Sequence, residues 1–154
     1  MVSASVALLL ASCATRSVST LGPKAEPGKA VIKGGSVAIV PIGFQYTYIA
    51  GIDGVLTKDW SGSHQVRPGK HRFAFATSHA STVKSYAEAE LNLKEGQQYV
   101  VEGSNTRESY ADYVVLEGEA RKEVLRLTGP LVAAAGPSAG GKIQTILKAK
   151  GWRE

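Results

Sequence analysis

The stretch YAEAELNL, residues 86–93, alternates strictly between small or apolar and polar side chains from Ala87 to Leu93. Successive side chains of an extended chain point to opposite sides, so its alanines and leucines share one face and its glutamates share the other. This pattern predicts a half-buried antiparallel strand that packs on a core through one face. The turn-forming residues 94–97 follow, and residues 98–102 predict a returning strand with Tyr99 and Val101 on one face.

Short runs of the same kind, separated by turn residues, lie on both sides of this stretch. They are residues 36–41, 45–52, 64–67, 71–75, 113–116 and 123–128. The last run contains good helix formers, so a helix is its alternative. Six or seven strands at roughly ten-residue spacing predict an all-β fold, a small antiparallel β-sandwich.

Two turns divide this series of strands. Residues 53–54 are Asp-Gly and predict a tight hairpin, because both residues tolerate positive φ angles. Residues 68–69 are Pro-Gly and predict a type II turn, which we expect to pair its flanking strands with Val66 opposite His71. In this register Phe73 points into the core and His71 lies at its rim.

The N-terminal residues have the pattern of an export signal. The apolar run VALLLA at residues 6–11 is too short to span a bilayer, which needs about 20 residues. It ends in LASC at residues 10–13, which resembles the lipobox of bacterial lipoproteins. The resemblance implies cleavage before Cys13 and lipidation of its thiol. Cys13 is the only cysteine, so a disulfide framework is excluded.

Composition and charge divide the chain further. Residues 36–136 carry ten basic and eleven acidic side chains, whereas both ends are basic. This distribution argues against nucleic-acid binding, which needs a basic patch on the folded body. Residues 142–150 place apolar side chains at helical spacing, but so short a helix must dock on the sandwich, meet a partner or a membrane surface, or stay frayed. A third hairpin turn is expected at Gly34-Gly35, after a short strand at 30–33.

These features define four segments. They are a lipoprotein signal peptide (1–12), a lipidated tether (13–35), a β-sandwich domain (36–128), and a flexible linker with a short C-terminal amphipathic helix (129–154).

Three turn motifs, in this order, are similar to those of PEGA-type domains of bacterial envelope lipoproteins. They are IDG at 52–54, VRPGKH at 66–71 and LKEGQQYV at 93–100. The resemblance covers about residues 45–105. It implies a small sandwich domain in the cell envelope that acts without catalysis, and it carries over no active site.

Chemical motifs are weak. GPSAG at 136–140 has the spacing of a nucleophile elbow, but neither Asp nor His follows Ser138 to complete a catalytic triad. Residues 136–142 also approach the spacing of a P-loop, but Ile143 stands where that motif needs a serine or threonine hydroxyl. His64, His71 and His79 match no zinc spacing. We therefore predict no catalytic residue, no metal and no cofactor. Tyr46 and Tyr48 share one strand face and form the candidate binding surface.

The sequence therefore predicts a lipoprotein of the outer membrane that faces the periplasm and binds or scaffolds an envelope protein or the cell-wall polymer. It is held to the membrane through Cys13, and nucleic acid is not expected as a partner. Two alternatives stay open: a small envelope hydrolase or enzyme inhibitor, and an accessory lipoprotein of a secretion or pilus assembly.

Overall fold

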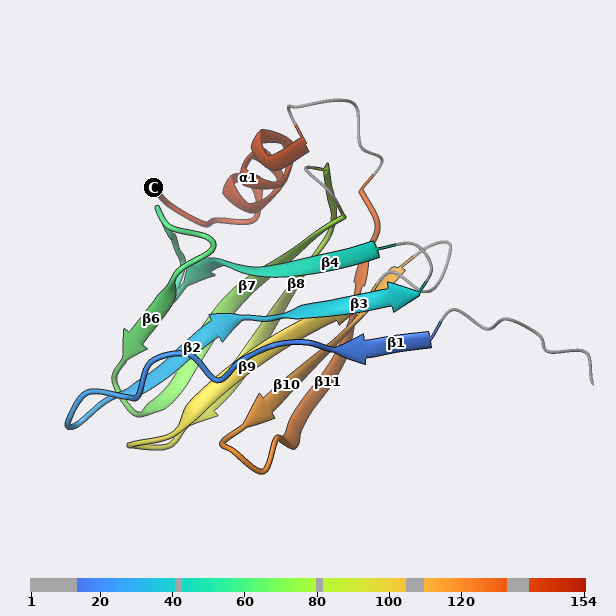
Figure 1. The fold of residues 1–154 in the computed structure, drawn as a ribbon. Helices are drawn as coiled ribbons and strands as arrows, with labels where there is room; N and C mark the ends of the chain where they lie inside the picture. The colour runs from blue at the N-terminus through green and yellow to red at the C-terminus, as the bar shows by residue number, and fades with distance from the viewer. Residues whose placement is uncertain (1–13, 41–42, 80–81, 105–109, 133–138) are drawn as a thin grey trace, which may run out of the picture.

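The alternating runs form strands of two stacked sheets in the computed structural model, which describes residues 14–40, 43–79, 82–104, 110–132 and 139–154 (Figure 1). The elements are β1 (Ala14–Ser17), β2 (Ala30–Gly34), β3 (Ser36–Val40), β4 (Gly43–Ile52), β5 (Val55–Leu56), β6 (Ser63–Val66), β7 (Gly69–His79), β8 (Thr82–Leu93), β9 (Gln98–Ser104), β10 (Tyr110–Glu117), β11 (Lys122–Pro130) and α1 (Ala139–Ala149). The predicted fold class, an all-β sandwich with a C-terminal helix, is confirmed. The eleven strands within the described residues exceed the six or seven predicted; they include the two-residue strand β5, and also β1 and β2, which lie in the segment predicted as tether.

Sheet A has the strand order β1-β3-β4-β7-β8, with β5 paired to β4, and sheet B has the order β11-β10-β9-β2-β6. Neighbouring strands are antiparallel except β2 and β9, which are parallel. The core lies between the sheets, where Phe73 and Phe75 stack with ring centroids 6.0 Å apart and Tyr113 stacks 6.2 Å from Phe75. All three side chains are fully buried, as alternation predicts for Phe73.

The central stretch 86–93 forms the C-terminal part of β8, and its apolar face points to the core as predicted. Ala87, Leu91 and Leu93 are buried, and Ala89 packs against them. The 53–54 turn is also confirmed: Ile52 pairs with Val55, and both turn residues have positive φ. Residues 123–128 lie within β11, so the strand is correct and the helical alternative is wrong.

Two predicted hairpins are wrong, because each of the turns carries the chain from one sheet to the other. β6 pairs with β2 in sheet B, whereas β7 lies between β4 and β8 in sheet A, so Val66 does not pair with His71. At Gly34-Gly35 the chain passes from β2 to β3. There the Gly35 N–H donates to Val101 of sheet B (2.8 Å), and its carbonyl accepts from the Thr47 N–H of sheet A (2.9 Å).

The folded part extends beyond the predicted 36–128 on both sides. β1 and β2 lie within the segment predicted as tether, because β1 pairs with β3 and β2 is held between β6 and β9. β11 continues to Pro130, and Leu131 forms an isolated bridge to Ser85. The segment predicted as a signal peptide (1–12), Cys13 and residues 133–138 of the predicted linker lie outside the described residues.

The predicted C-terminal helix is confirmed as α1, and it docks on the outer face of sheet A. Ile143 and Leu147 are fully buried there against a second apolar cluster. This cluster includes the small side chains Ala50, Ala74 and Ala76. Among the described residues, no helix has the length and hydropathy needed to cross a bilayer.

Candidate binding groove

A polar groove lies between the β1–β3 ribbon and strands β9, β10 and β11 in the described part of the chain. Its cavity volume is about 330 Å³, which falls at the small end of the range for ligand sites. The lining residues combine hydroxyl, charged and aliphatic side chains: Ser17, Val37, Glu102, Ser104, Asp112, Val114, Leu116, Glu123 and Arg126. We call this depression the β9–β11 groove.

Two arginines hold carboxylates of this groove in place. Arg121, at the β10–β11 turn, pairs with Glu102, whose side chain is 10% exposed. Arg126 donates two hydrogen bonds to Glu123, at 2.9 and 2.8 Å. The hydrogen bond from Arg126 lowers the pKa of Glu123. The groove therefore presents two carboxylates that are each paired with an arginine.

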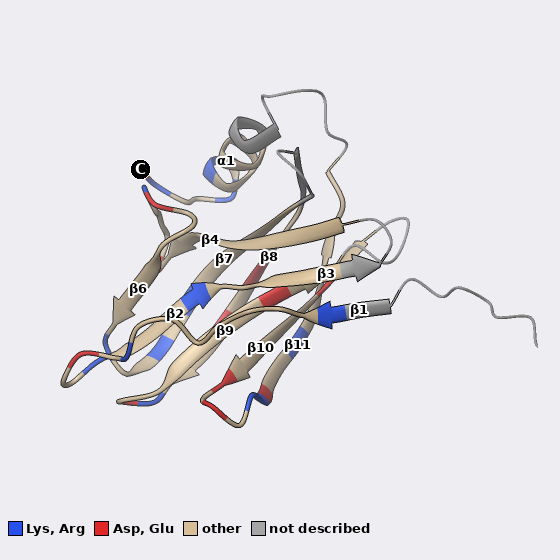
Figure 2. Cartoon of the chain, viewed as in Figure 1, with Lys and Arg blue, Asp and Glu red and all other residues tan. Residues whose placement is uncertain are grey.

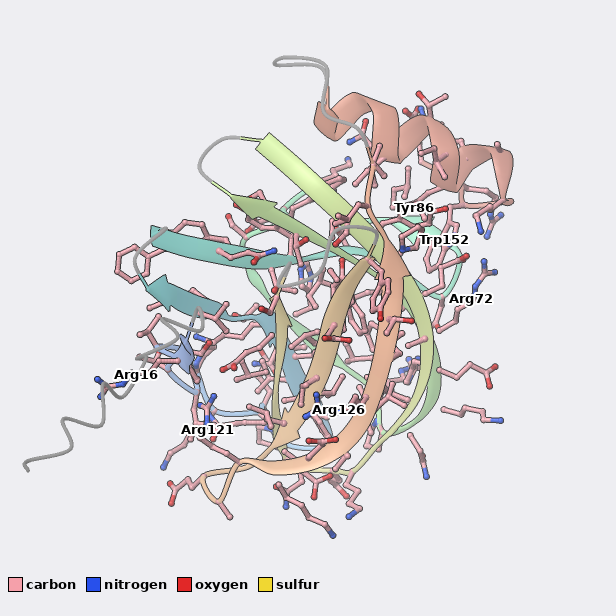
Figure 3. The ribbon with its side chains drawn as sticks, turned by 90° about the vertical axis from the view of Figure 1, so that its right-hand side faces the viewer. Arg16, Arg72, Tyr86, Arg121, Arg126 and Trp152 are labelled. Atoms are coloured by element: carbon pink, nitrogen blue, oxygen red, sulfur yellow. The ribbon has the colours of Figure 1, made fainter. Side chains whose placement is uncertain are left out.

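Arg121 also ties the N-terminal strand to sheet B. Its guanidinium donates to the Ser17 hydroxyl (2.6 Å), and that hydroxyl donates to Glu102 (2.5 Å). Arg121 has a positive φ of 53°, which a non-glycine residue adopts at some cost. These contacts place β1 as one wall of the groove. Figure 3 shows Arg121 on this side of the sandwich, away from the helix.

The hydroxyl of Ser104 lies in the same groove. Its oxygen is buried and has no hydrogen-bond partner among the residues that the structure describes. A buried hydroxyl without a partner costs free energy, so it favours a ligand that supplies one. The arrangement is suited to holding a polar or amphipathic ligand by hydrogen bonds.

The predicted surface residues Tyr46 and Tyr48 both lie on the outer face of β4, but in different settings. Tyr46 is 43% exposed. Tyr48 is half-buried, with its hydroxyl 2.8 Å from the Ser78 hydroxyl and its ring 6.4 Å from Trp60. A shallow pocket of about 190 Å³ beside them is also lined by Lys33. Whether Tyr46 and Tyr48 bind a partner stays a prediction.

The remaining candidate side chains are dispersed. His71 lies at the rim, where its Nδ1 is 2.6 Å from Asp53 and its Nε2 is 2.7 Å from the Arg67 carbonyl. His64 is on β6 in the other sheet, next to Ser63 on the same strand. The side chain of His79 and residues 136–138 of the motif at 136–140 lie outside what is described. Within the described residues, no group of three metal-ligating side chains comes together.

Glu88 was expected to belong to a solvated strand face, and it is instead covered by the C-terminal residues. The Trp152 indole N–H and a guanidinium N–H of Arg72 each donate to its carboxylate at 2.6 Å. Lys150 adds an ion pair at 3.5 Å, and the Arg72 guanidinium lies 4.5 Å from the Trp152 ring centroid. Figure 3 shows Arg72, Tyr86 and Trp152 gathered beneath α1.

The residues after the helix also extend a sheet. The Arg153 N–H donates to the Gly54 carbonyl (2.8 Å), and its carbonyl accepts from Leu56 (2.7 Å). Sequence reasoning missed this docking site, because neither Trp152 nor Glu88 belongs to a recognisable motif. The one available signal was the tryptophan shortly after the amphipathic run at 142–150. Tryptophan side chains are highly buried on average, so this residue indicated a contact with the sandwich.

Acid should weaken this docking. Burial opposes the ionisation of Glu88, but its hydrogen bonds with Arg72 and Trp152 outweigh that effect and lower its pKa from 4.5. A carboxyl with a lowered pKa stabilises the docked state above its ordinary pKa, and this stabilisation is lost as the pH falls below about 4.5. We expect hydrogen-exchange protection of residues 143–147 to fall over that range while β7 stays protected. Glu88→Gln should weaken protection at pH 7 and reduce its pH dependence. An unchanged pH profile in that variant would contradict the assignment.

No family model matches the chain, and no match was found among curated proteins or solved structures.

Proposed function

We propose that the protein is an outer-membrane lipoprotein that faces the periplasm and binds or scaffolds another envelope component without catalysis. The observation that carries this proposal is the LASC sequence at residues 10–13, with strand β1 beginning at Ala14. A lipid on Cys13 would therefore hold the sandwich close to the membrane. In bacterial lipoproteins an aspartate directly after the lipidated cysteine favours retention in the inner membrane. Ala14 occupies that position here, which favours the outer membrane.

The β9–β11 groove supports binding as the activity. Glu102 and Glu123 are each paired with an arginine, so these two carboxylates act as fixed acceptors and not as free acids or bases. The basic ends of the chain suit an anionic partner surface. The partner that we propose is an envelope protein or the cell-wall polymer.

Replacement of Cys13 by serine tests the anchor. The wild-type protein should be recovered with membranes, and its N-terminal peptide should begin at Cys13 with the mass of attached acyl groups. Cys13→Ser should move most of the protein to the soluble fraction, because several buried acyl chains give durable anchoring. Ser12→Ala keeps a small residue before the cut and should leave fractionation unchanged. An unmodified N-terminus on protein from its native cells would refute the proposal.

A further inference from the structure

The outer face of β1, β3 and β4 forms a continuous surface directly after Cys13. Arg16 is paired with Ala38, and Ala38 with Phe44, so these three residues form a row across the strands. Directly opposed residues of antiparallel strands point to the same face. In the next row Val18 donates its N–H to Ser36, which is paired with Tyr46. We call the surface of Arg16, Val18, Phe44 and Tyr46 the anchor-side face.

This face gathers exposed apolar side chains. Phe44 is 52% exposed, Tyr46 43% and Val18 42%, and they are three of the five large hydrophobic side chains exposed in the described residues. Ser36 and Ala38 lie between them and are small, so the two rings rise above their surroundings. α1 covers Ala50, Ala74 and Ala76 on the same sheet and leaves this corner uncovered. Exposed apolar side chains that cluster in this way mark interaction surfaces.

The charge of the anchor-side face is positive. Arg16 lies on β1, and β3 and β4 carry no acidic residue in the part that is described. Figure 2 shows β1 with a basic segment beside uncharged β3 and β4, whereas acidic residues lie mainly on other strands and turns. Lys33 lines the pocket next to Tyr46. Aromatic rings beside cations suit a membrane interface, where rings enter the headgroup region and cations meet lipid phosphates.

We propose that the anchor-side face lies on an anionic phospholipid surface, with Phe44, Tyr46 and Val18 in the interfacial region. This inference rests on the proposed lipidation, because it is Cys13 that brings this face to a membrane. Arg16 is three residues after Cys13, which is about 10 Å of extended chain. The sandwich would then rest on the membrane through the corner of sheet A that β1, β3 and β4 form. Both the acyl chains on Cys13 and the anchor-side face would hold it there.

The single thiol allows a test that does not depend on processing in cells. The full chain, prepared without acylation, is coupled through Cys13 to a maleimide-phospholipid in vesicles of phosphatidylglycerol and phosphatidylethanolamine. Phe44→Trp places a fluorescent reporter on the face, and Val124→Trp places one at an exposed hydrophobic position on β11. Brominated lipids quench tryptophans that enter the interface. The signal of wild-type protein, from Trp60 and Trp152, is subtracted.

Quenching of Phe44→Trp should exceed that of Val124→Trp by at least about threefold, because only the first ring reaches the lipid. Arg16→Gln should reduce this difference in vesicles that contain phosphatidylglycerol and not in neutral vesicles. Equal quenching at both positions would overturn the inference while leaving the lipoprotein proposal intact. Protection of Phe44→Trp from iodide only after addition of envelope proteins would also overturn it, in favour of a protein partner. An unmodified Cys13 in native cells would instead refute the proposed function.

Discussion

A Gly34→Ala chain is expected not to form the sandwich. Gly34 is the last residue of β2, where the chain leaves sheet B, and a Cβ atom there would lie 1.7 Å from the Thr47 carbonyl oxygen of β4. The Thr47 oxygen belongs to the backbone and the position of a Cβ is fixed by its own backbone, so no side-chain rotation relieves the overlap. Separation of the strands would break the hydrogen bond from Thr47 to Gly35 and open the core beneath it. The cost should exceed about 5 kcal/mol, which is comparable to the whole stability of a small domain.

Far-ultraviolet circular dichroism during thermal and urea unfolding measures this effect. Gly62→Ala is the matched control, because a Cβ at Gly62 meets only the end of the exposed Asp59 side chain, which can move. We expect the control to unfold within a few degrees of wild type and Gly34→Ala to show no cooperative transition. A cooperative melt of Gly34→Ala near the wild-type temperature would show that the two sheets do not approach closely at this corner.

The same corner shows why local sequence predicted the strands but not all of their partners. The alternation in 86–93 and the Asp-Gly turn at 53–54 depend on side-chain direction and φ alone, and both predictions are correct. Gly34-Gly35 was expected to form a hairpin, because adjacent glycines tolerate tight turns. What requires glycine there is the close approach of Thr47, which is distant in the sequence. A single sequence carries no signal for such a contact.

The groove could not be predicted for a related reason. Its walls come from β1, β3, β9, β10 and β11, so it exists only after the two sheets have packed. Glu102 and Arg121 show no special spacing, and neither was singled out before the fold was known. Tyr46 was identifiable because its exposure follows from strand alternation alone. Features that depend on one strand were therefore predictable, whereas features that join distant strands were not.

Docking of the C-terminal residues offers the second large effect, and it should be local. Trp152 is 2% exposed and contacts the second apolar cluster, which shares no buried residue with the main core. Trp152→Ala should destabilise the docked state by about 3–5 kcal/mol. α1 has eleven residues, too few for a stable helix in water. We therefore expect α1 to unfold while the sandwich remains folded.

Gly51→Ala should produce the same release from the opposite side of the contact. A Cβ at Gly51 would lie 2.6 Å from the Trp152 ring. The nearest backbone atom, the Val55 oxygen, would be 3.2 Å away, so β4 itself should tolerate alanine. Arg153→Ala is the control, because Arg153 is exposed and contacts β5 through its backbone. If both Trp152→Ala and Gly51→Ala release the helix, the indole and the glycine gap act as one interface.

Hydrogen exchange measured by residue resolves these outcomes. In Trp152→Ala, amides of residues 143–147 should lose at least about a hundredfold of protection, as 3 kcal/mol implies. Amides of β7 should keep most of theirs, because Phe73 and Phe75 belong to the main core. Trypsin should then cleave after Lys148 and Lys150 in both release variants and spare these sites in Arg153→Ala. Persistent protection of 143–147 in Trp152→Ala would mean that Ile143 and Leu147 alone hold the helix, and that the Glu88–Trp152 contact contributes little to its docking.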